Sequence, residues 1–171
     1  MKLALGADHR GVNASKQLAD RLKSMGHDVQ LVGDMSGDMC DYPEPAYHVG
    51  SAVAGGKADL GILICGSGIG MCIAANKIKG VRAALVHDEL TAEMSRGHNN
   101  ANVICLSADL LGQKLIEKIV EVWLATGFEG GRHERRVRKI HAIEKGEDPT
   151  KLKSTRGRVK VGRASCRCAG G

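Results

Sequence analysis

The stretch Leu60-Gly61-Ile62-Leu63-Ile64-Cys65-Gly66-Ser67-Gly68-Ile69-Gly70 joins an apolar run directly to a glycine-rich turn. The apolar run predicts a central parallel strand, because a strand covered on both faces is apolar at nearly every position. The glycines allow backbone N–H groups to approach a ligand, and the N-terminus of the following helix favours negative charge there. We therefore expect the thiolate of Cys65 to be stabilised, which makes it a candidate base or nucleophile. The competing interpretation is a small buried hydrophobic residue, the commoner role of such a cysteine.

Strand and helix patterns alternate along the rest of the chain. We expect strands at residues 2–6, 28–32, 59–65, 81–86 and 103–106. We expect helices at residues 11–25, 45–54, 70–76, 89–96, 110–126 and 132–147. This alternation predicts an α/β protein with one doubly wound parallel sheet of about five strands, a Rossmann-like three-layer sandwich. Ligands of such sheets bind at the carboxyl ends of the strands, where the strand order switches.

The composition predicts one domain followed by a basic tail. The chain has 171 residues, of which 43% are hydrophobic, so a sizeable core is expected. Aromatic residues make up only 2%, which counts against a module that stacks on RNA bases. Residues 150–171 carry seven Lys and Arg and no acid, so the net charge of +6 leaves residues 1–149 near neutrality. We expect a folded domain over 1–149, a disordered tail over 150–171, and no nucleic-acid binding except through that tail.

The cysteines and the first residues predict a location in the cytoplasm. The six cysteines form no C-x-x-C pair, which indicates free thiols in a reducing compartment. Cys166 and Cys168 form a C-x-C, but no second ligand pair is near, so no metal site is expected. The chain begins on a predicted strand and has no apolar run of membrane length, so neither a signal peptide nor a membrane span is expected.

Two polar motifs each allow two interpretations. Asp8-His9-Arg10-Gly11 follows the first strand. In one interpretation Asp8 caps the following helix and His9 is solvated. In the other, the Asp8 carboxylate binds sugar hydroxyls and the His9 imidazole binds an anion. His98-Asn99-Asn100-Ala101-Asn102 precedes the last strand and is either a turn, which Asn favours, or a set of donors and acceptors for a hydroxyl-rich ligand.

Two further motifs concern phosphate. In Gly130-Gly131-Arg132-His133-Glu134-Arg135-Arg136, Arg132 and Arg136 share one helix face and could clamp a phosphate, although most charge runs are solvated faces. The Gly66–Gly70 turn, with Asp88 after the next strand, also allows a dinucleotide-binding interpretation. Its pattern is G-x-G-x-G rather than G-x-G-x-x-G, which weakens that interpretation.

Taken together, these motifs resemble the ribose-5-phosphate isomerase B family and its relatives, the galactose-6-phosphate isomerase subunits. The resemblance covers residues 1 to about 148 and rests on six segments in family order: Gly6-Ala7-Asp8-His9-Arg10-Gly11, Asp41-Tyr42-Pro43, Ile64–Gly70, Ala74-Ala75-Asn76-Lys77, His98–Asn102 and Gly130–Arg136.

The resemblance implies a cofactor-free and metal-free aldose–ketose isomerase that interconverts D-ribose 5-phosphate and D-ribulose 5-phosphate in the pentose phosphate pathway. Cys65 would be the base that moves a proton between C2 and C1 through a cis-enediolate, with Ser67 beside it. His98 would open the furanose ring. The oxyanion would be stabilised by the backbone N–H groups of Gly66, Gly68, Ile69 and Gly70. The phosphate would be bound by His9, Arg132 and Arg136. The sugar would be held by Asp8, Tyr42 and Asn99.

The resemblance also implies a homodimer, or a tetramer, with shared active sites. The His98 segment and the arginine segment are expected to reach one pocket from different chains, and the C-terminal helix to reach a partner subunit. Two substitutions depart from the family pattern: Ser67 replaces the commoner Thr, and Asp109 falls where many members have an arginine. We expect Asp109 either to repel a phosphate or to pair with Arg132 or Arg136.

Two other functions therefore stay open. One is isomerisation of another sugar, namely a tetrose or hexose phosphate or a free aldose such as allose. The other is a non-catalytic regulator that binds a sugar phosphate or a nucleotide, with the tail contacting a nucleic acid or a partner.

Overall fold

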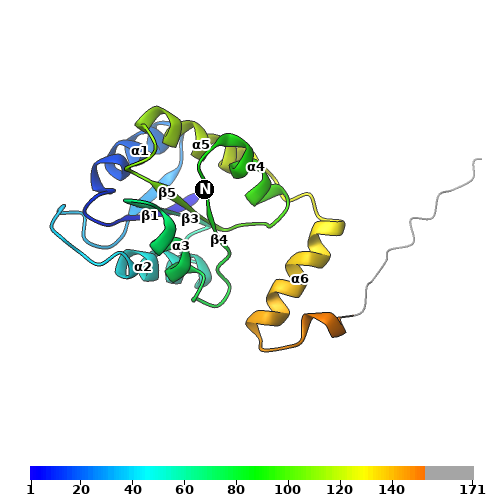
Figure 1. The fold of residues 1–171 in the computed structure, drawn as a ribbon. Helices are drawn as coiled ribbons and strands as arrows, with labels where there is room; N and C mark the ends of the chain where they lie inside the picture. Colours follow the sequence, from blue (N-terminus) through cyan, green and yellow to red (C-terminus); the bar gives the residue numbers. More distant parts are fainter. Residues whose placement is uncertain (153–171) are drawn as a thin grey trace, which may run out of the picture.

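The computed structural model describes residues 1–152, which form one parallel sheet covered by helices on both faces (Figure 1). All neighbouring strands are parallel, and their order is β2-β1-β3-β5-β4. The strands are β1 (Lys2–Ala7), β2 (Asp28–Leu31), β3 (Leu60–Cys65), β4 (Ala83–Leu85) and β5 (Val103–Ser107). The predicted fold class is confirmed, with β5 between β3 and the edge strand β4.

Six α-helices connect and follow the strands, close to where the sequence predicts them. They are α1 (Val12–Ser24), α2 (Pro43–Ala54), α3 (Ile69–Ala75), α4 (Glu89–Gly97), α5 (Gln113–Ala125) and α6 (Arg132–Glu144), followed by a 3₁₀ turn at Pro149–Lys151. Helix α2 begins two residues earlier than predicted, because Pro43 suits the first turn of a helix.

The helices bury two aliphatic cores against the sheet. On one face, Leu18 of α1 and Ile116 of α5 pack with Ile62 of β3. On the other face, α2 and α3 place Val49 and Met71 against the sheet. Because aromatic residues are scarce, Val, Ile, Leu, Ala and Met supply almost all of the apolar burial.

The strand order places the switch point between β1 and β3. From β1 the chain turns to β2 on one side, whereas β3, β5 and β4 lie on the other side. The loops after β1 and β3 therefore run in opposite directions, and open α/β sheets bind ligands at such a switch point on the carboxyl edge. Cys65 and Asp8 lie in these two loops or at their start.

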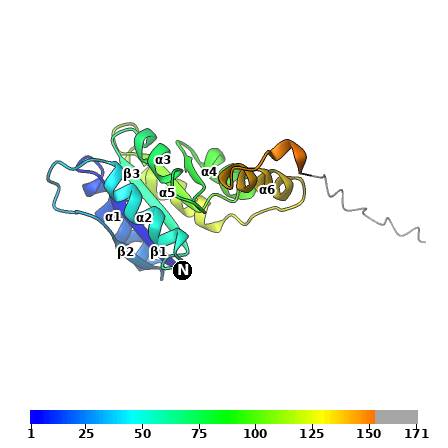
Figure 2. The ribbon, with the colours of Figure 1, turned by 90° about the horizontal axis from the view of Figure 1, so that it is seen from below.

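Helix α6 lies to one side of this body, beyond β4, in both ribbon views (Figures 1 and 2). Arg82 Nη1 lies 3.0 Å from His141 Nε2, and Gly80 N–H donates to Glu144 Oε1 at 2.6 Å. Between α6 and residues 76–85 runs a cleft of about 700 Å³, with Ile140 and Ile143 in its lining.

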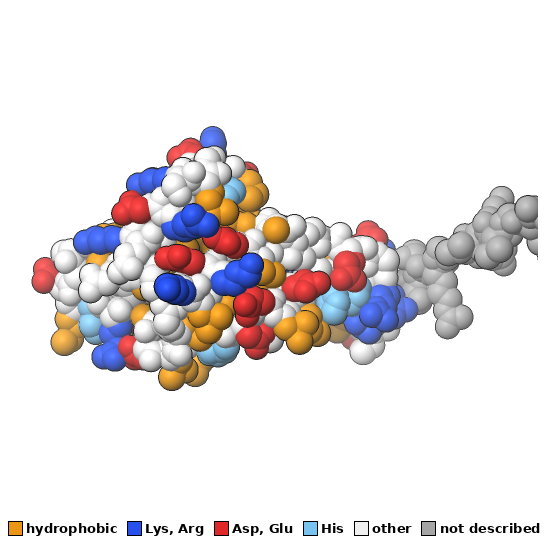
Figure 3. All heavy atoms as spheres, turned by 90° about the horizontal axis from the view of Figure 1, so that it is seen from above, with side chains coloured by type: hydrophobic (Ala, Val, Ile, Leu, Met, Phe, Trp, Pro, Cys, Tyr) orange, Lys and Arg blue, Asp and Glu red, His pale blue; other side chains and the backbone are white. Residues whose placement is uncertain are grey.

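The surface agrees with the charge distribution that the sequence predicts. On the face shown in Figure 3, Lys and Arg side chains are interspersed with Asp and Glu over the body. None of the helices within residues 1–152 is long and apolar enough to cross a membrane. The predicted tail lies outside the described residues from position 153 onward, as do Cys166 and Cys168.

Candidate active site

Cys65 ends β3 in a buried position, with only 4% of its surface exposed. Its Sγ accepts a hydrogen bond from the N–H of Gly68 at 3.1 Å. Gly68 has a φ of +76°, and a Cβ there would lie 2.6 Å from Leu85 Cδ1. Only glycine fits such a position, so the residue type at 68 fixes the turn that brings backbone N–H groups to the sulphur.

The pKa of the Cys65 thiol is raised in the unliganded protein. Burial is the largest cause, and the negative charge of Asp8 adds to it. Backbone N–H groups of Gly68, Met71 and Ser67 act in the opposite direction. The prediction of a stabilised thiolate is therefore wrong, since the N–H groups are present but burial outweighs them.

Two other predicted residues, Tyr42 and Asp8, reach the same loop. The ring of Tyr42 lies so close to Gly70 that a Cβ on Gly70 would come within 2.6 Å of Tyr42 Cε2. Asp8 is buried, and its Oδ1 accepts the N–H groups of Arg10 at 3.0 Å and Gly11 at 3.1 Å. Asp8 thus closes the turn that leads into α1 and also lies near enough to Cys65 to affect its pKa.

His9 and Ser67 are exposed beside these groups. Ser67 Oγ accepts the N–H of Ile69 at 3.3 Å, so its hydroxyl also supports the turn. The structure therefore gathers the predicted residues of the β1, Tyr42 and Cys65 segments at the carboxyl edge of the sheet.

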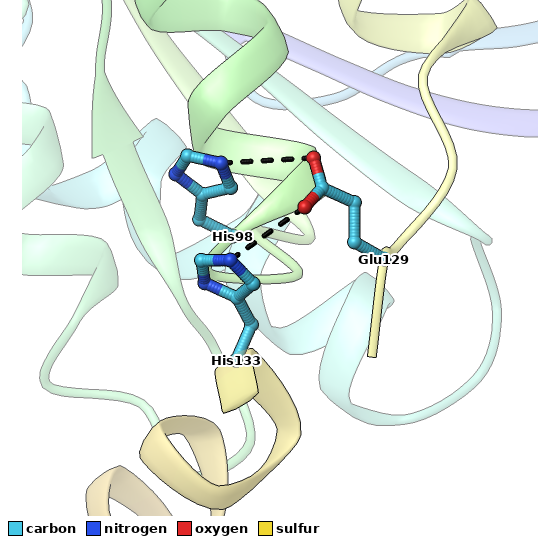
Figure 4. A group of neighbouring side chains, drawn as sticks. All are labelled: His98, Glu129 and His133. Carbon is cyan, nitrogen blue, oxygen red and sulfur yellow. Dashed lines mark ion pairs between the residues drawn. The ribbon is translucent and has the colours of Figure 1, made fainter. Parts of the chain in front are cut away.

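A second group of side chains surrounds His98, directly after α4 (Figure 4). The rings of His98 and His133 stack with centroids 4.2 Å apart and an angle of 7° between their planes. Glu129 lies beside both, with Oε1 3.6 Å from His98 Nε2 and Oε2 3.5 Å from His133 Nε2. The carboxylate thus lies beside both imidazoles and is placed to orient them.

The predicted arginines belong to this second group. Arg132 Nε donates to His133 Nε2 at 3.1 Å. Burial lowers the pKa of His133, and the positive charges of His98, Arg132 and Arg136 lower it further. The expectation that the His98 segment and the arginine segment come from different chains is wrong, because both lie side by side in one chain.

The ligand atoms of His98, Glu129 and His133 all lie within 4.8 Å of one another, so these residues could contact a metal ion. An imidazole binds a metal in the plane of its ring, however, and two nearly parallel rings cannot both point at one ion. The arrangement therefore fits a stacked pair of histidines beside a carboxylate better than a metal centre.

The asparagines after His98 divide into structural and exposed residues. Asn102 accepts the N–H of Arg82 at 2.7 Å and donates to Gly80 O at 2.8 Å. Asn100 adopts a left-handed conformation with φ of +48°, and its carbonyl accepts from the Arg82 guanidinium. The interpretation as a turn is correct for these two, whereas Asn99 is exposed and lines the cleft beside α6.

The two groups lie at opposite edges of the sheet within one chain. Gly61, near the start of β3, donates its N–H to Asn102 O at 2.9 Å, so the His98 turn is at the amino edge. Cys65 is four residues further along the same strand, or about 13 Å away. The Cys65 group and the His98 group therefore lie at opposite ends of the strands within a single chain.

Two structural details bear on the other sequence interpretations. Asp88 caps α4 by accepting the N–H of Thr91 at 2.7 Å, so this carboxylate has a structural role rather than the ribose contact of a dinucleotide site. Asp109 pairs neither with Arg132 nor with Arg136; its partner is Arg10, at 2.8 Å between Oδ2 and Nη2.

Sequence reasoning missed Glu129 and His133 as parts of the site. His133 stands inside the predicted arginine motif, and Glu129 just precedes that motif. Nothing in the local pattern shows that a carboxylate from this segment lies beside an imidazole 31 positions earlier, because the contact depends on how α4 and α5 pack together.

The fold is that of an α/β protein with a single parallel sheet, and the first group gathers polar side chains at the carboxyl edge of that sheet. Residues 3–140 match the model of the Ribose/Galactose Isomerase family, and the chain belongs to this family. It is thus an aldose–ketose isomerase, as the resemblance predicts, and not a non-catalytic regulator.

Three similar proteins illustrate the relationship. Ribose-5-phosphate isomerase B of Escherichia coli K12 is 43% identical over 143 residues, which cover 84% of this chain and 96% of that protein. D-erythrulose-4-phosphate isomerase of Pectobacterium atrosepticum is 40% identical, with 86% and 97% covered. The crystal structure of ribose-5-phosphate isomerase B from Mycoplasma genitalium with bound ribulose-5-phosphate is 44% identical, with a TM-score of 0.82 and 84% and 96% of the two chains covered.

Proposed function

We propose that this enzyme interconverts D-ribose 5-phosphate and D-ribulose 5-phosphate. The observation that carries this proposal is the thiol of Cys65 at the switch point, held under a glycine turn whose N–H groups face it. The bound ribulose-5-phosphate named for the Mycoplasma genitalium structure supports a pentose phosphate as the ligand.

In the proposed reaction the thiolate of Cys65 removes the proton from C2 of the open-chain aldose and returns it to C1, while the hydroxyl proton of O2 passes to O1. The intermediate is a cis-enediolate whose negative charge develops on oxygen. Backbone N–H groups of the loop from Gly66 to Gly70, together with the Ser67 hydroxyl, would stabilise that charge. Such donors are most effective when they are fixed before the reaction, and the positive φ of Gly68 fixes this turn.

Residues of both groups share the remaining roles. His98 would act as acid and base in opening the furanose ring, with Glu129 holding its imidazole. Arg132 and Arg136 would bind the phosphate together with His9, and Asp8, Tyr42 and Asn99 would contact the sugar. No metal or cofactor is needed for any of these steps.

Because the two groups lie at opposite edges of one chain, we propose that each active site is shared between two copies of the chain. The exposed apolar side chains of α6, Ile140 and Ile143, support a contact of this helix with a partner. The test is complementation between two inactive variants, Cys65→Ala and His98→Ala. Random mixing after dissociation should restore about one quarter of the wild-type activity, because half of the dimers then contain one intact site. No restored activity would contradict a shared site.

The substrate is tested by comparing kcat/KM across ribose, erythrose and hexose phosphates and free allose. We expect ribose 5-phosphate to exceed the others by about tenfold or more, because small differences in chain length cost 1–3 kcal/mol in a fitted site. The D-erythrulose-4-phosphate isomerase relative makes a tetrose phosphate the second candidate. A higher kcat/KM for the tetrose phosphate than for ribose 5-phosphate would contradict the proposed substrate and make the tetrose phosphate the preferred one.

A further inference from the structure

An ion pair between Arg10 and Asp109 lies directly over the start of the Cys65 loop. Arg10 donates from Nε to Asp109 Oδ2 at 2.9 Å and Oδ1 at 3.1 Å, and its Nη2 lies 2.8 Å from Oδ2. A Cβ on Gly66 would lie 2.9 Å from Asp109 Oδ2 and 3.0 Å from Arg10 Cδ. The pair therefore contacts the residue that immediately follows Cys65.

Backbone contacts fix both halves of this pair against the loop. Ala108 N–H donates to Cys65 O at 2.8 Å, and Asp109 N–H donates to Gly66 O at 3.1 Å. Arg10 follows His9 in the turn that Asp8 closes. The pair thus joins the loop after β1 to the loop after β5 at the carboxyl edge of the sheet, beside the Cys65 loop.

The exposure of the pair indicates that it contributes little to the stability of the fold. The side chains are 55% and 41% exposed, and exposed ion pairs contribute little to stability. A guanidinium has five N–H donors in a planar fork, and Asp109 engages only those on one edge. Within residues 1–152 the other edge has no partner, so it is available to a ligand.

We propose that Arg10 is a substrate-binding residue that contacts the phosphate group next to His9, and that Asp109 is the positioning residue that orients its guanidinium. The acid at position 109 then does not repel the phosphate, because its charge is neutralised by the arginine it holds. This inference rests on the proposed function, since a phosphorylated sugar must enter this site.

The chain offers a matched control in a second exposed ion pair. Arg21 on α1 donates from Nε and Nη2 to Glu121 on α5, at 3.1 and 2.9 Å, on the helical face away from the candidate site. With D-ribose 5-phosphate as substrate, Arg10→Ala should raise KM about tenfold and leave kcat within about twofold, because a charge-assisted contact is lost without touching the reacting atoms. The inhibition constant of inorganic phosphate should rise in parallel, whereas Arg21→Ala should change none of these quantities.

The positioning role of Asp109 is tested by two further variants. Asp109→Asn should raise KM by about threefold while the charge of Arg10 is kept, and Arg10→Lys should recover only part of the KM lost in Arg10→Ala, because lysine lacks the planar fork. If Asp109 instead acted by repelling phosphate, Asp109→Asn would lower KM. A lower KM in this variant, or an Arg10→Ala protein indistinguishable from Arg21→Ala, would overturn the proposal.

Failure of the proposed function gives a different result. If the wild-type chain isomerises no pentose phosphate, calorimetric titration with inorganic phosphate still reports on Arg10. Weaker phosphate binding by Arg10→Ala than by Arg21→Ala would then support the anion site without the substrate, and equal binding would refute it.

Discussion

Cys65 Sγ accepts the N–H of Gly68 at 3.1 Å, while Asp8, on the neighbouring loop, places a negative charge near the same sulphur. The hydrogen bond from Gly68 favours a thiolate, whereas the burial of Cys65 and the negative charge of Asp8 favour a neutral thiol. Burial has the larger effect, so the pKa of Cys65 is raised. In the proposed mechanism Cys65 therefore loses its proton during the catalytic cycle, before it accepts the proton from C2.

The thiols are predicted to differ in their pH dependence of alkylation. A hydrogen bond from the thiol of Cys105 lowers the pKa of Cys72 to about 7, whereas burial raises that of Cys65. A thiol is neutral below its pKa, so the alkylation rate of Cys72 by iodoacetamide should level off above about pH 8, one unit past its pKa, whereas that of Cys65 should still be rising. Peptide mass spectrometry measures each rate separately, and a Cys65 rate that levels off below neutral pH would show that its thiolate is stabilised after all.

Gly68→Ala should destabilise the fold more than Gly26→Ala. Both glycines have positive φ, of +76° and +85°, but a Cβ at position 26 meets nothing within 4 Å. Gly26→Ala should therefore cost about 1 kcal/mol from backbone strain alone. Gly68→Ala adds a clash with Leu85 and the Leu106 backbone, for a total of about 3 kcal/mol.

The two variants are compared by urea unfolding, with catalytic activity as a second measurement. Gly68→Ala should also lose most activity, because the turn that holds Cys65 must shift. Equal free energies of unfolding for Gly68→Ala and Gly26→Ala would show that Leu85 and the Leu106 backbone move aside without destabilising the fold.

Glu129→Gln should lower kcat by about tenfold, because the amide no longer stabilises the protonated imidazole of His98 during ring opening. The KM should change little, since Glu129 is not among the phosphate-binding residues. Glu93→Gln on the exposed side of α4 serves as the control. An unchanged kcat for Glu129→Gln would remove this carboxylate from the proposed mechanism.

Acid should destabilise the native chain partly through His133. Burial lowers the pKa of this residue in the folded state, so the unfolded chain binds the proton more readily. The contribution of neutral His133 to the free energy of unfolding is complete above the pKa of histidine in the unfolded chain, about 6.5. This contribution is lost as the pH falls toward the lower pKa of His133 in the folded chain. The Tm of the wild type should therefore fall more steeply below about pH 6.5 than that of His133→Gln, and parallel curves would contradict this assignment.

Local patterns predict the elements of this fold well, because apolar runs and glycine turns determine them residue by residue. The stretch that ends at Cys65 is a central strand, and Tyr42 and Asp8 lie at its carboxyl edge as predicted. What the pattern cannot supply is the balance of opposing effects on one atom. The N-terminus of a helix and a glycine turn predict a thiolate at Cys65. The burial of Cys65, which raises its pKa, depends on how the helices pack on the sheet and cannot be read from the local sequence.

Long-range pairings are the other part that sequence reasoning misses. Asp109 is expected to repel phosphate or to bind an arginine of the last helix, but its partner is Arg10, from the first loop of the chain. His98 and Arg132 are expected in different chains of one site, but they lie in one group with Glu129 and His133. Both outcomes follow from the strand order, with β5 next to β3, and from α4 packing beside α5.

The central claim is that Cys65 transfers the substrate proton, and its most direct test is the turnover of Cys65→Ala and Cys65→Ser with D-ribose 5-phosphate. Loss of a general base costs a factor of about 10² to 10⁴, so we expect Cys65→Ala to lose kcat by that factor and Cys65→Ser to keep a small remainder. Both variants should bind inorganic phosphate as the wild type does, which shows that the fold and the anion site are intact. Near-normal turnover in both variants would contradict the account.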